Sequence, residues 1–314
     1  MNLVKTTIFL MIMSGHVIAQ NVHVTGTVST TLNEPIASVT GKNLPPVAHA
    51  TKTREIKLLK IELSNKALRT LKRNVSNALY HLNQPNNMAL NQHEKLPSIV
   101  QLRMNNVPVL NQGSHGTCAT FAVTAAIDAV LNKGAYLSEL CPLQLGNYLA
   151  ENGYTQSAWN GAIGRQILSQ MDIFGIVSKE QESIHGCGEL FQNPTDGNDP
   201  TSSISTGDYF KISEPLAGMD NITWWPVLDI FQAFTDRIDT NTTLSQVKAA
   251  LAKGDRLMFG VLMLDFDQGM MGAVGTKNHT FDTWVLTPEI ARDVILRPTF
   301  GGHAMVITSL IPSN

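Results

Sequence analysis

One cysteine and one histidine stand in settings that favour nucleophilic chemistry. Cys118 follows the glycine-containing loop Gln112–Gly116 and directly precedes an apolar run. A thiol in the first turn of a helix has a lowered pKa because the helix dipole stabilises the thiolate, and a neighbouring imidazolium lowers it further. His303 leads into a predicted strand, as a histidine held at a sheet edge would, and is the candidate base. Such a thiol and base are commonly far apart in sequence and adjacent in the fold.

The loop before Cys118 also carries a candidate oxyanion donor. Gln112 lies six residues before the thiol, so its amide is placed to donate, beside the Cys118 backbone N–H, to a developing oxyanion. The loop glycines let the backbone pass close to a substrate. The alternative is that Cys118 is a small buried core residue that starts a helix.

The surrounding pattern predicts the elements that position these groups. Residues Cys118–Leu131 are apolar on nearly every face, which is typical of a helix buried on most sides. Early helices followed by late strands indicate an α+β domain that starts near Leu96. The further expected elements are helices over Pro142–Glu151 and Gly161–Phe174 and buried strands over Leu257–Leu264 and Ala304–Thr308.

The N-terminus has the order of features that export requires. It carries a positive charge at Lys5, a short apolar core over Ile8–Met13 and a small residue at Ala19. This order predicts a signal peptide over residues 1–19, and the alternative is a buried N-terminal helix. We therefore expect a secreted protein, extracellular or periplasmic en route, in which disulfides persist. We expect no association with a membrane after signal cleavage.

Residues 20–95 are expected to form a separate unit. Val22–Leu32 is rich in β-branched residues and predicts a strand, and the Asn33–Pro35 stretch that follows resembles a turn. Arg54–Leu63 is ambiguous between strand and helix. Ser64 is the expected N-cap of a helix whose apolar stripe must dock on another element, because so short a helix is marginal alone. That stripe consists of Leu68, Leu71, Val75, Leu79 and Leu82.

The net charge of −2 is unevenly distributed along the chain. Residues 20–95 hold ten Lys and Arg against four Asp and Glu, whereas residues 96–314 hold twelve against twenty-one. The two segments should therefore attract each other. The basic residues are scattered and have no interleaved aromatics, so we expect no nucleic-acid partner.

Four stretches, in the right order, resemble papain-like (C1 family) cysteine peptidases of the secreted bacterial type. PVLNQGSHGTCATFA resembles the segment around the family's nucleophile and GGHAMVIT its His segment. YLSEL (Tyr136–Leu140) resembles its Leu-Ser-Glu-Gln stretch, and AWNGA (Ala158–Ala162) its Gly-Cys-Asn-Gly-Gly segment. The resemblance implies a helical left subdomain and a β-rich right one, with the active site in the cleft between them. It implies Cys118 as nucleophile, His303 as base and acid, and Gln112 as oxyanion donor, with no metal and no cofactor.

The resemblance also divides the chain and implies its partners. Residues 20–95 become an inhibitory propeptide, which the charge balance favours independently, and residues 96–314 the peptidase domain. That domain is expected to be truncated at its C-terminus, since the family's orienting Asn has no clear counterpart before Asn314. The implied partners are protein or peptide substrates and the propeptide, as an intramolecular inhibitor of a monomer. The implied substrate cleft contains Gly116, Gly161, Ala162 and Gly302.

The cysteines depart from the family pattern. His115 and Trp159 stand where the family has a disulfide-bonded pair, so we predict that their side chains pack against each other. Cys141 lies one helical turn before a family cysteine position, on the same face, and the resemblance implies that it pairs with Cys187. The alternative is that Cys187 is a free buried thiol.

Two functions follow from the sequence. The first is a secreted cysteine peptidase made as a zymogen, and the intact Cys118 and His303 favour it. The alternative is a catalytically impaired papain-like binding protein that lacks the C-terminal Asn and barrel strands.

The charge distribution predicts that maturation is favoured by acid. Carboxylates with ordinary pKa values near ~4 lose their charge as pH falls, which weakens the attraction between the basic and acidic segments. Removal of residues 20–95 from the purified chain, followed by gel electrophoresis, should therefore be faster at acidic than at neutral pH. Equal conversion rates at both pH values, without added protease, would contradict this prediction.

Overall fold

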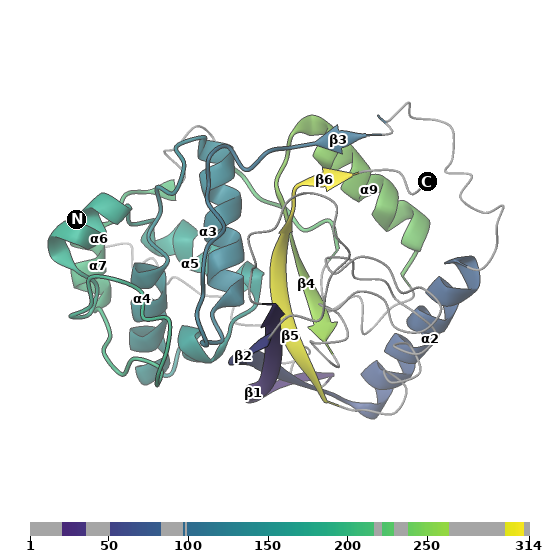
Figure 1. Cartoon of the computed structure of the whole chain (residues 1–314), viewed down its shortest axis with the longest axis horizontal. Coiled ribbons are helices and arrows are strands. Elements are labelled where there is room, and N and C mark those ends of the chain that lie inside the picture. Colours follow the sequence, from purple (N-terminus) through teal and green to yellow (C-terminus); the bar gives the residue numbers. More distant parts are fainter. Residues whose placement is uncertain are drawn as a thin grey trace, which may run out of the picture.

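The computed structural model describes residues 21–35, 51–82, 97, 99–216, 222–228, 238–263 and 299–310. Within these residues the fold is of the α+β class, with helices packed around a four-stranded antiparallel sheet (Figure 1). The expected signal peptide over 1–19 lies outside the described residues. In the part of the chain that is described, no helix is both long enough and apolar enough to cross a membrane.

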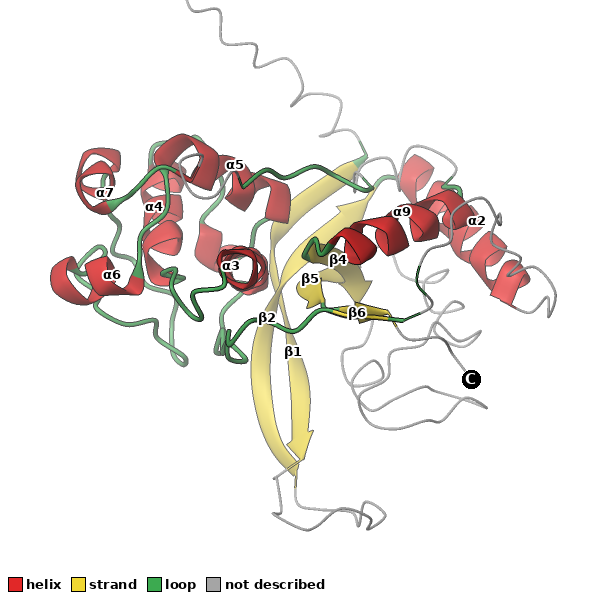
Figure 2. Cartoon of the chain, turned by 90° about the horizontal axis from the view of Figure 1, so that it is seen from above, coloured by secondary structure: helices red, strands yellow, loops and turns green. Residues whose placement is uncertain are grey.

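The sheet combines strands from the two ends of the chain. Its order is β1-β2-β5-β4, where β1 is Val22–Pro35, β2 is Thr51–Leu63, β4 is Leu257–Met263 and β5 is Thr299–Ile307. The long β1–β2 hairpin therefore adds directly to β5, and one end of the hairpin extends beyond the other described elements (Figure 2). The segment 20–95 thus shares a sheet with the C-terminal strands.

The hairpin settles two local questions from the sequence. The ambiguous stretch Arg54–Leu63 is a strand, because Leu59 and Ile61 are buried in the sheet when it is extended. The turn expected at Asn33–Pro35 is wrong, since these residues continue β1 and Pro35 pairs with Thr51. Proline is tolerated there because β1 has a strand partner on only one side among the described strands.

The helix after the hairpin begins as predicted. Helix α2 spans Asn65–Leu82, and the Ser64 hydroxyl caps it by accepting a hydrogen bond from the Ala67 backbone N–H at 3.2 Å. Leu68, Leu71 and Val75 from the predicted stripe pack against a cluster that includes β2 and Phe300 of β5. The helix therefore docks on the sheet by its apolar face, as its short length requires.

The helices lie on both sides of the sheet. Helices α3 to α7 lie on one side, and α2 and α9 lie on the other (Figure 2). The remaining bounds are α3 Cys118–Leu131, α4 Leu140–Glu151, η1 Ala158–Asn160, α5 Gly164–Phe174, α6 Lys179–His185, α7 Thr206–Ile212 and α9 Thr240–Lys253. Two short strands, β3 Val100–Gln101 and β6 Ser309–Leu310, form a separate ladder.

Helix α3 is the central helix of this side, as its apolar sequence predicted. Nearly all of its residues are buried, and its Ala119–Val123 end packs with Met258 of β4 and Ala304 of β5. Its one buried carboxylate, Asp128, accepts hydrogen bonds from the backbone N–H groups of Tyr136 and Leu137. The helix therefore anchors both the sheet and the loop that precedes α4.

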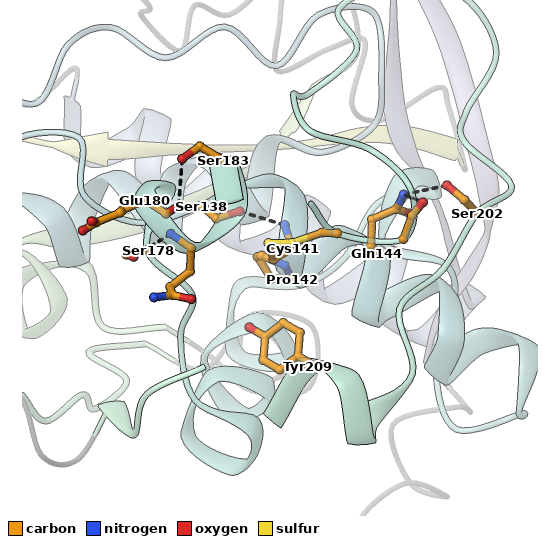
Figure 3. Close-up of a disulfide and its surroundings, with 12 residues drawn as sticks. Ser138, Cys141, Pro142, Gln144, Ser178, Glu180, Ser183, Ser202 and Tyr209 are labelled. Atoms are coloured by element: carbon orange, nitrogen blue, oxygen red, sulfur yellow. Dashed lines mark hydrogen bonds between the residues drawn. A yellow bond between two sulfur atoms is a disulfide. The ribbon is translucent and has the colours of Figure 1, made fainter. Parts of the chain in front are cut away.

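A disulfide between Cys141 and Cys187 joins α4 to the chain after α6, with their Cα atoms 5.1 Å apart (Figure 3). Both cysteines are buried, and the Cys141 backbone N–H donates to the Ser138 hydroxyl at 2.8 Å. This pairing confirms the disulfide that the resemblance implied, and the alternative of a free Cys187 is wrong. Cys118 is left as the free cysteine of the chain.

The N-cap of α2 gives a direct test of how the hairpin and helix are joined. Replacing Ser64 by Ala leaves the Ala67 N–H without its acceptor and also removes the Ser64 contact to Asn21. We expect Ser64→Ala to lower the free energy of unfolding by about 1 kcal/mol, measured by urea denaturation. Ser76→Ala, at an exposed position in the same helix, should stay within ~0.5 kcal/mol of the parent. Equal effects of the two changes would rule out the capping role.

Candidate functional site

The Cys118 thiol lies against the main chain that follows His303, where α3 meets β5. Cys118 is the first residue of α3, and its thiol accepts a hydrogen bond from the backbone N–H of Ala304. Ala304 directly follows His303 in β5, the strand against which α3 packs (Figure 1). Cys118 and the chain at His303, far apart in sequence, are therefore neighbours in the fold, and a reaction between their side chains stays a prediction.

His303 lies at the point where β5 stops pairing with β2. It lies within β5, which has β4 on one side and β2 on the other, and it pairs with Val261 of β4. On the other side, the ladder to β2 ends at Gly302, one residue before His303. The hairpin thus pairs with β5 only up to the residue before His303, whereas β4 pairs with His303 on the other side.

Burial keeps both groups neutral in this arrangement. Cys118 is only 5% exposed, and burial raises its pKa to about 11, although hydrogen bonds from the backbone N–H groups of Ala304 and Ala119 act in the opposite direction. Burial likewise lowers the pKa of His303 to about 4, because an imidazolium would lose its hydration. The expected lowering of the thiol pKa at a helix start is therefore outweighed by desolvation.

Gln112 holds the loop that leads to the thiol. Its Nε2 donates to the backbone carbonyl of His115 at 2.8 Å, which closes the turn before Cys118. A primary amide carries two N–H groups, so one bond inside the loop leaves a second donor for a ligand. The oxyanion role assigned to Gln112 would use that second N–H.

His115 and Trp159 pack against each other, which confirms the prediction made from the missing cysteine pair. Their ring centroids are 5.2 Å apart and their planes are inclined at 79°, an edge-to-face contact. Both side chains are fully buried. His115 is oriented by Asp199, whose Oδ1 lies 2.6 Å from its Nδ1. The contact thus joins the Cys118 loop to η1 and to the chain at residue 199.

Two of the predicted cleft glycines lie against Leu59 of the hairpin, and the third, Gly116, lies beside one of them. Gly116 donates its backbone N–H to the Trp159 carbonyl and lies against Gly161. Gly161 has φ +102°, and a methyl group there would come within 2.7 Å of Leu59 Cδ1. Gly302 pairs with Leu59, and a methyl group on it would lie 3.4 Å from Leu59 Cβ. Leu59 therefore fills the space between Gly161 and Gly302.

Ala162 lies apart from this group. It packs, half-buried, against the cluster of α3 and α5 that includes Ala119 and Ile167. Of the four predicted cleft residues, the structure thus places Gly161 and Gly302 against Leu59, Gly116 next to Gly161, and Ala162 toward the helical core.

The hairpin reaches the Cys118 loop through Lys57 as well. The Lys57 backbone N–H donates to the Ser114 carbonyl at 2.9 Å, and its Nζ lies 3.0 Å from Asp199 Oδ2. No motif in the sequence marks Lys57, Leu59 or Asp199 as site residues. One usable signal is strand alternation, since Lys57 and Leu59 must share a face once the stretch is assigned as a strand.

The described residues include no group of three or more His, Cys, Asp or Glu side chains that could hold a metal ion. A comparison of the chain with models of known protein families finds no match. A comparison with curated proteins finds no match either.

The ion pair between Lys57 and Asp199 holds the hairpin against the Cys118 loop, so its loss should change how often Cys118 becomes accessible. Because Cys118 is the free thiol, alkylation by iodoacetamide reports on its exposure. Lys57→Ala removes the ion pair to Asp199, so the hairpin should open more often and the alkylation rate should rise roughly two- to fivefold.

A second lysine on the same strand provides the control. Lys60 pairs with Glu62, also in β2, at 2.8 Å, so its loss removes no such ion pair between the hairpin and the Cys118 loop. Lys60→Ala should alkylate at the parent rate. A rate unchanged by Lys57→Ala, or raised equally by both substitutions, would contradict the assignment.

Proposed function

We propose that this chain is a papain-like cysteine peptidase made as a secreted zymogen, in which residues 20–95 act as an inhibitory propeptide. The observation that carries the proposal is the contact of the Cys118 thiol with the main chain that follows His303, next to the end of the β2–β5 ladder. The position of Leu59 against Gly161 and Gly302 supports it, because a strand already occupies the place proposed for substrate.

The proposed reaction is peptide-bond hydrolysis through an acyl-enzyme. His303 takes the proton of the Cys118 thiol, and the thiolate adds to the scissile carbonyl carbon. The resulting oxyanion accepts hydrogen bonds from the Cys118 backbone N–H and from Gln112. His303 then donates the proton to the leaving amine, the C–N bond breaks, and a thioester remains. His303 next accepts a proton from water, whose oxygen attacks the thioester, and the thiol leaves with that proton.

The buried state accounts for latency in this proposal. A thiol with a pKa of about 11 and an imidazole with a pKa of about 4 leave the reactive ion pair unformed at neutral pH. Departure of β2 would bring water to this site, and rehydration favours both the thiolate and the imidazolium. The hairpin therefore inhibits in two ways, by filling the substrate's place and by keeping the nucleophile protonated.

A papain-like binding protein without activity is the second candidate. The observation in its favour is the neutral state of both groups, since a site that never rehydrates would never form the thiolate. The two candidates differ in whether Cys118 becomes reactive once the hairpin has gone.

Covalent labelling separates the two candidates. The chain is folded whole, residues 20–95 are removed, and the product is treated with an epoxide-type inhibitor of thiol peptidases. We expect mass spectrometry to find the label on Cys118 and no label on a Cys118→Ala chain. His303→Ala should slow labelling at least ~100-fold, because the base that activates the thiol is lost.

His185→Ala is the matched control, since His185 is an exposed histidine at the end of α6. It should label at the parent rate. A folded, cut protein whose Cys118 stays unlabelled, or whose labelling rate is unchanged by His303→Ala, would reject the peptidase and favour the binding protein.

A further inference from the structure

Asp199 holds two different partners with its two oxygens. Its Oδ1 lies 2.6 Å from Nδ1 of His115, which is fully buried within the Cys118 loop. Its Oδ2 lies 3.0 Å from the Lys57 ammonium of the hairpin. One partner belongs to the peptidase domain and the other to the proposed propeptide. If the hairpin leaves, His115 still orients the Asp199 carboxylate, but Asp199 Oδ2 loses the Lys57 ammonium as its partner.

The position of Lys57 is that of a strand residue lying along the proposed cleft. Its backbone N–H donates to Ser114 in the Cys118 loop, while Leu59, two residues later, lies between Gly161 and Gly302. Alternate residues of a strand point to one face, so the Lys57 and Leu59 side chains enter the site together. The hairpin thus presents a basic side chain to Asp199 and, two residues later, an apolar side chain to Gly161 and Gly302.

We propose that Asp199 is the acidic wall of a subsite that takes the Lys or Arg side chain of a peptide substrate. The proposal rests on the function proposed above and names its substrate class: extended peptides with a basic residue two positions from an apolar residue such as Leu. The ammonium or guanidinium takes the place of Lys57, and the apolar side chain takes the place of Leu59.

The surroundings favour a cation over other ligands. The Asp199 side chain is 21% exposed, so its charge is partly desolvated and interacts more strongly with a cation than a fully exposed carboxylate would. Residues 96–314 carry more acidic than basic side chains, and this net negative charge also favours the binding of basic peptides. A purely structural role, in which Asp199 only orients His115, would leave substrate choice unaffected by the charge at residue 199.

The test begins with the whole chain, cut once by an added protease within residues 83–96 so that both pieces are present. Decapeptides containing one Leu and a single Lys, moved through each position in turn, are compared with copies in which norleucine replaces Lys. We expect one position at which Lys raises kcat/KM roughly five- to tenfold over norleucine. In Asp199→Asn, which keeps an acceptor for His115, that ratio should fall to near one.

A binding measurement keeps the proposal testable without catalysis. The same cut chain carrying Cys118→Ala is titrated with a peptide of residues 54–63, and release of the N-terminal piece is measured. Norleucine at the Lys57 position should weaken displacement roughly five- to tenfold, whereas norleucine at the Lys60 position should change it less than twofold. Should Asp199→Asn fail to fold, these two peptides still give the comparison on the parent site.

The outcomes separate this proposal from the one on which it rests. If Cys118 stays unreactive but the peptides still differ at the Lys57 position, the subsite stands and the peptidase function falls. If peptides are cleaved but Lys and norleucine are equal at every position, the function stands and the subsite is overturned. Equal displacement by all peptides, or displacement by none, overturns it as well.

Discussion

The antiparallel ladder between β2 and β5 is the interaction on which the rest of the structure depends. It runs from Glu62 paired with Thr299 to Leu59 paired with Gly302, and it stops one residue before His303. Without it, the main-chain groups on that side of β5 would lie at an open sheet edge, which proteins normally cover or pair. The same register places Leu59 against Gly161 and brings Lys57 to the Cys118 loop. One pairing thus sets the order of the sheet, the position of Leu59 and the placement of the Lys57 ammonium beside Asp199.

The chemistry of the site is decided by a competition between burial and local dipoles. Cys118 stands at a helix start with backbone N–H groups around its sulfur, an arrangement that by itself stabilises a thiolate. Burial opposes this and wins, since the pKa of the thiol is raised to about 11. Burial also lowers the pKa of His303, to about 4. In the proposed zymogen, control by a covering strand would need no change in Cys118 and His303 themselves.

Local patterns predicted much of the fold. The capped helix after Ser64, the buried helix from Cys118 and the strand over Leu257–Met263 all form as expected, because caps and apolar periodicity are properties of neighbouring residues. The His115–Trp159 contact was also predictable, since one substitution implied the other. That α3 would lie against β5 could be inferred only from the hypothesis that Cys118 and His303 act together.

What could not be predicted depends on pairing between distant strands. The sequence indicated that residues 20–95 would dock by opposite charge and by the leucine stripe of the helix after Ser64. The structure docks them by that stripe, by main-chain hydrogen bonds between β2 and β5, by Leu59 and by the Lys57–Asp199 ion pair. Backbone pairing carries almost no side-chain signature, so Asn33–Pro35 was expected in a turn and the β2–β5 ladder was not predicted. Lys57 and Asp199 are ordinary charged residues in sequence, and only the register of β2 makes them neighbours.

Native-state hydrogen exchange of the whole chain, at rising urea concentrations below unfolding, tests the central claim most directly. If β2 is a removable cover, the amides that bond across the ladder between residues 59–62 and 299–302 should exchange through one common opening, whereas the β5 amides that point to β4 keep their protection. The buried helix α3 should stay protected through that opening. Protection of the β5 amides that point to β2, persisting after residues 59–62 have exchanged, would show that β2 is not what closes this edge, and would contradict the account.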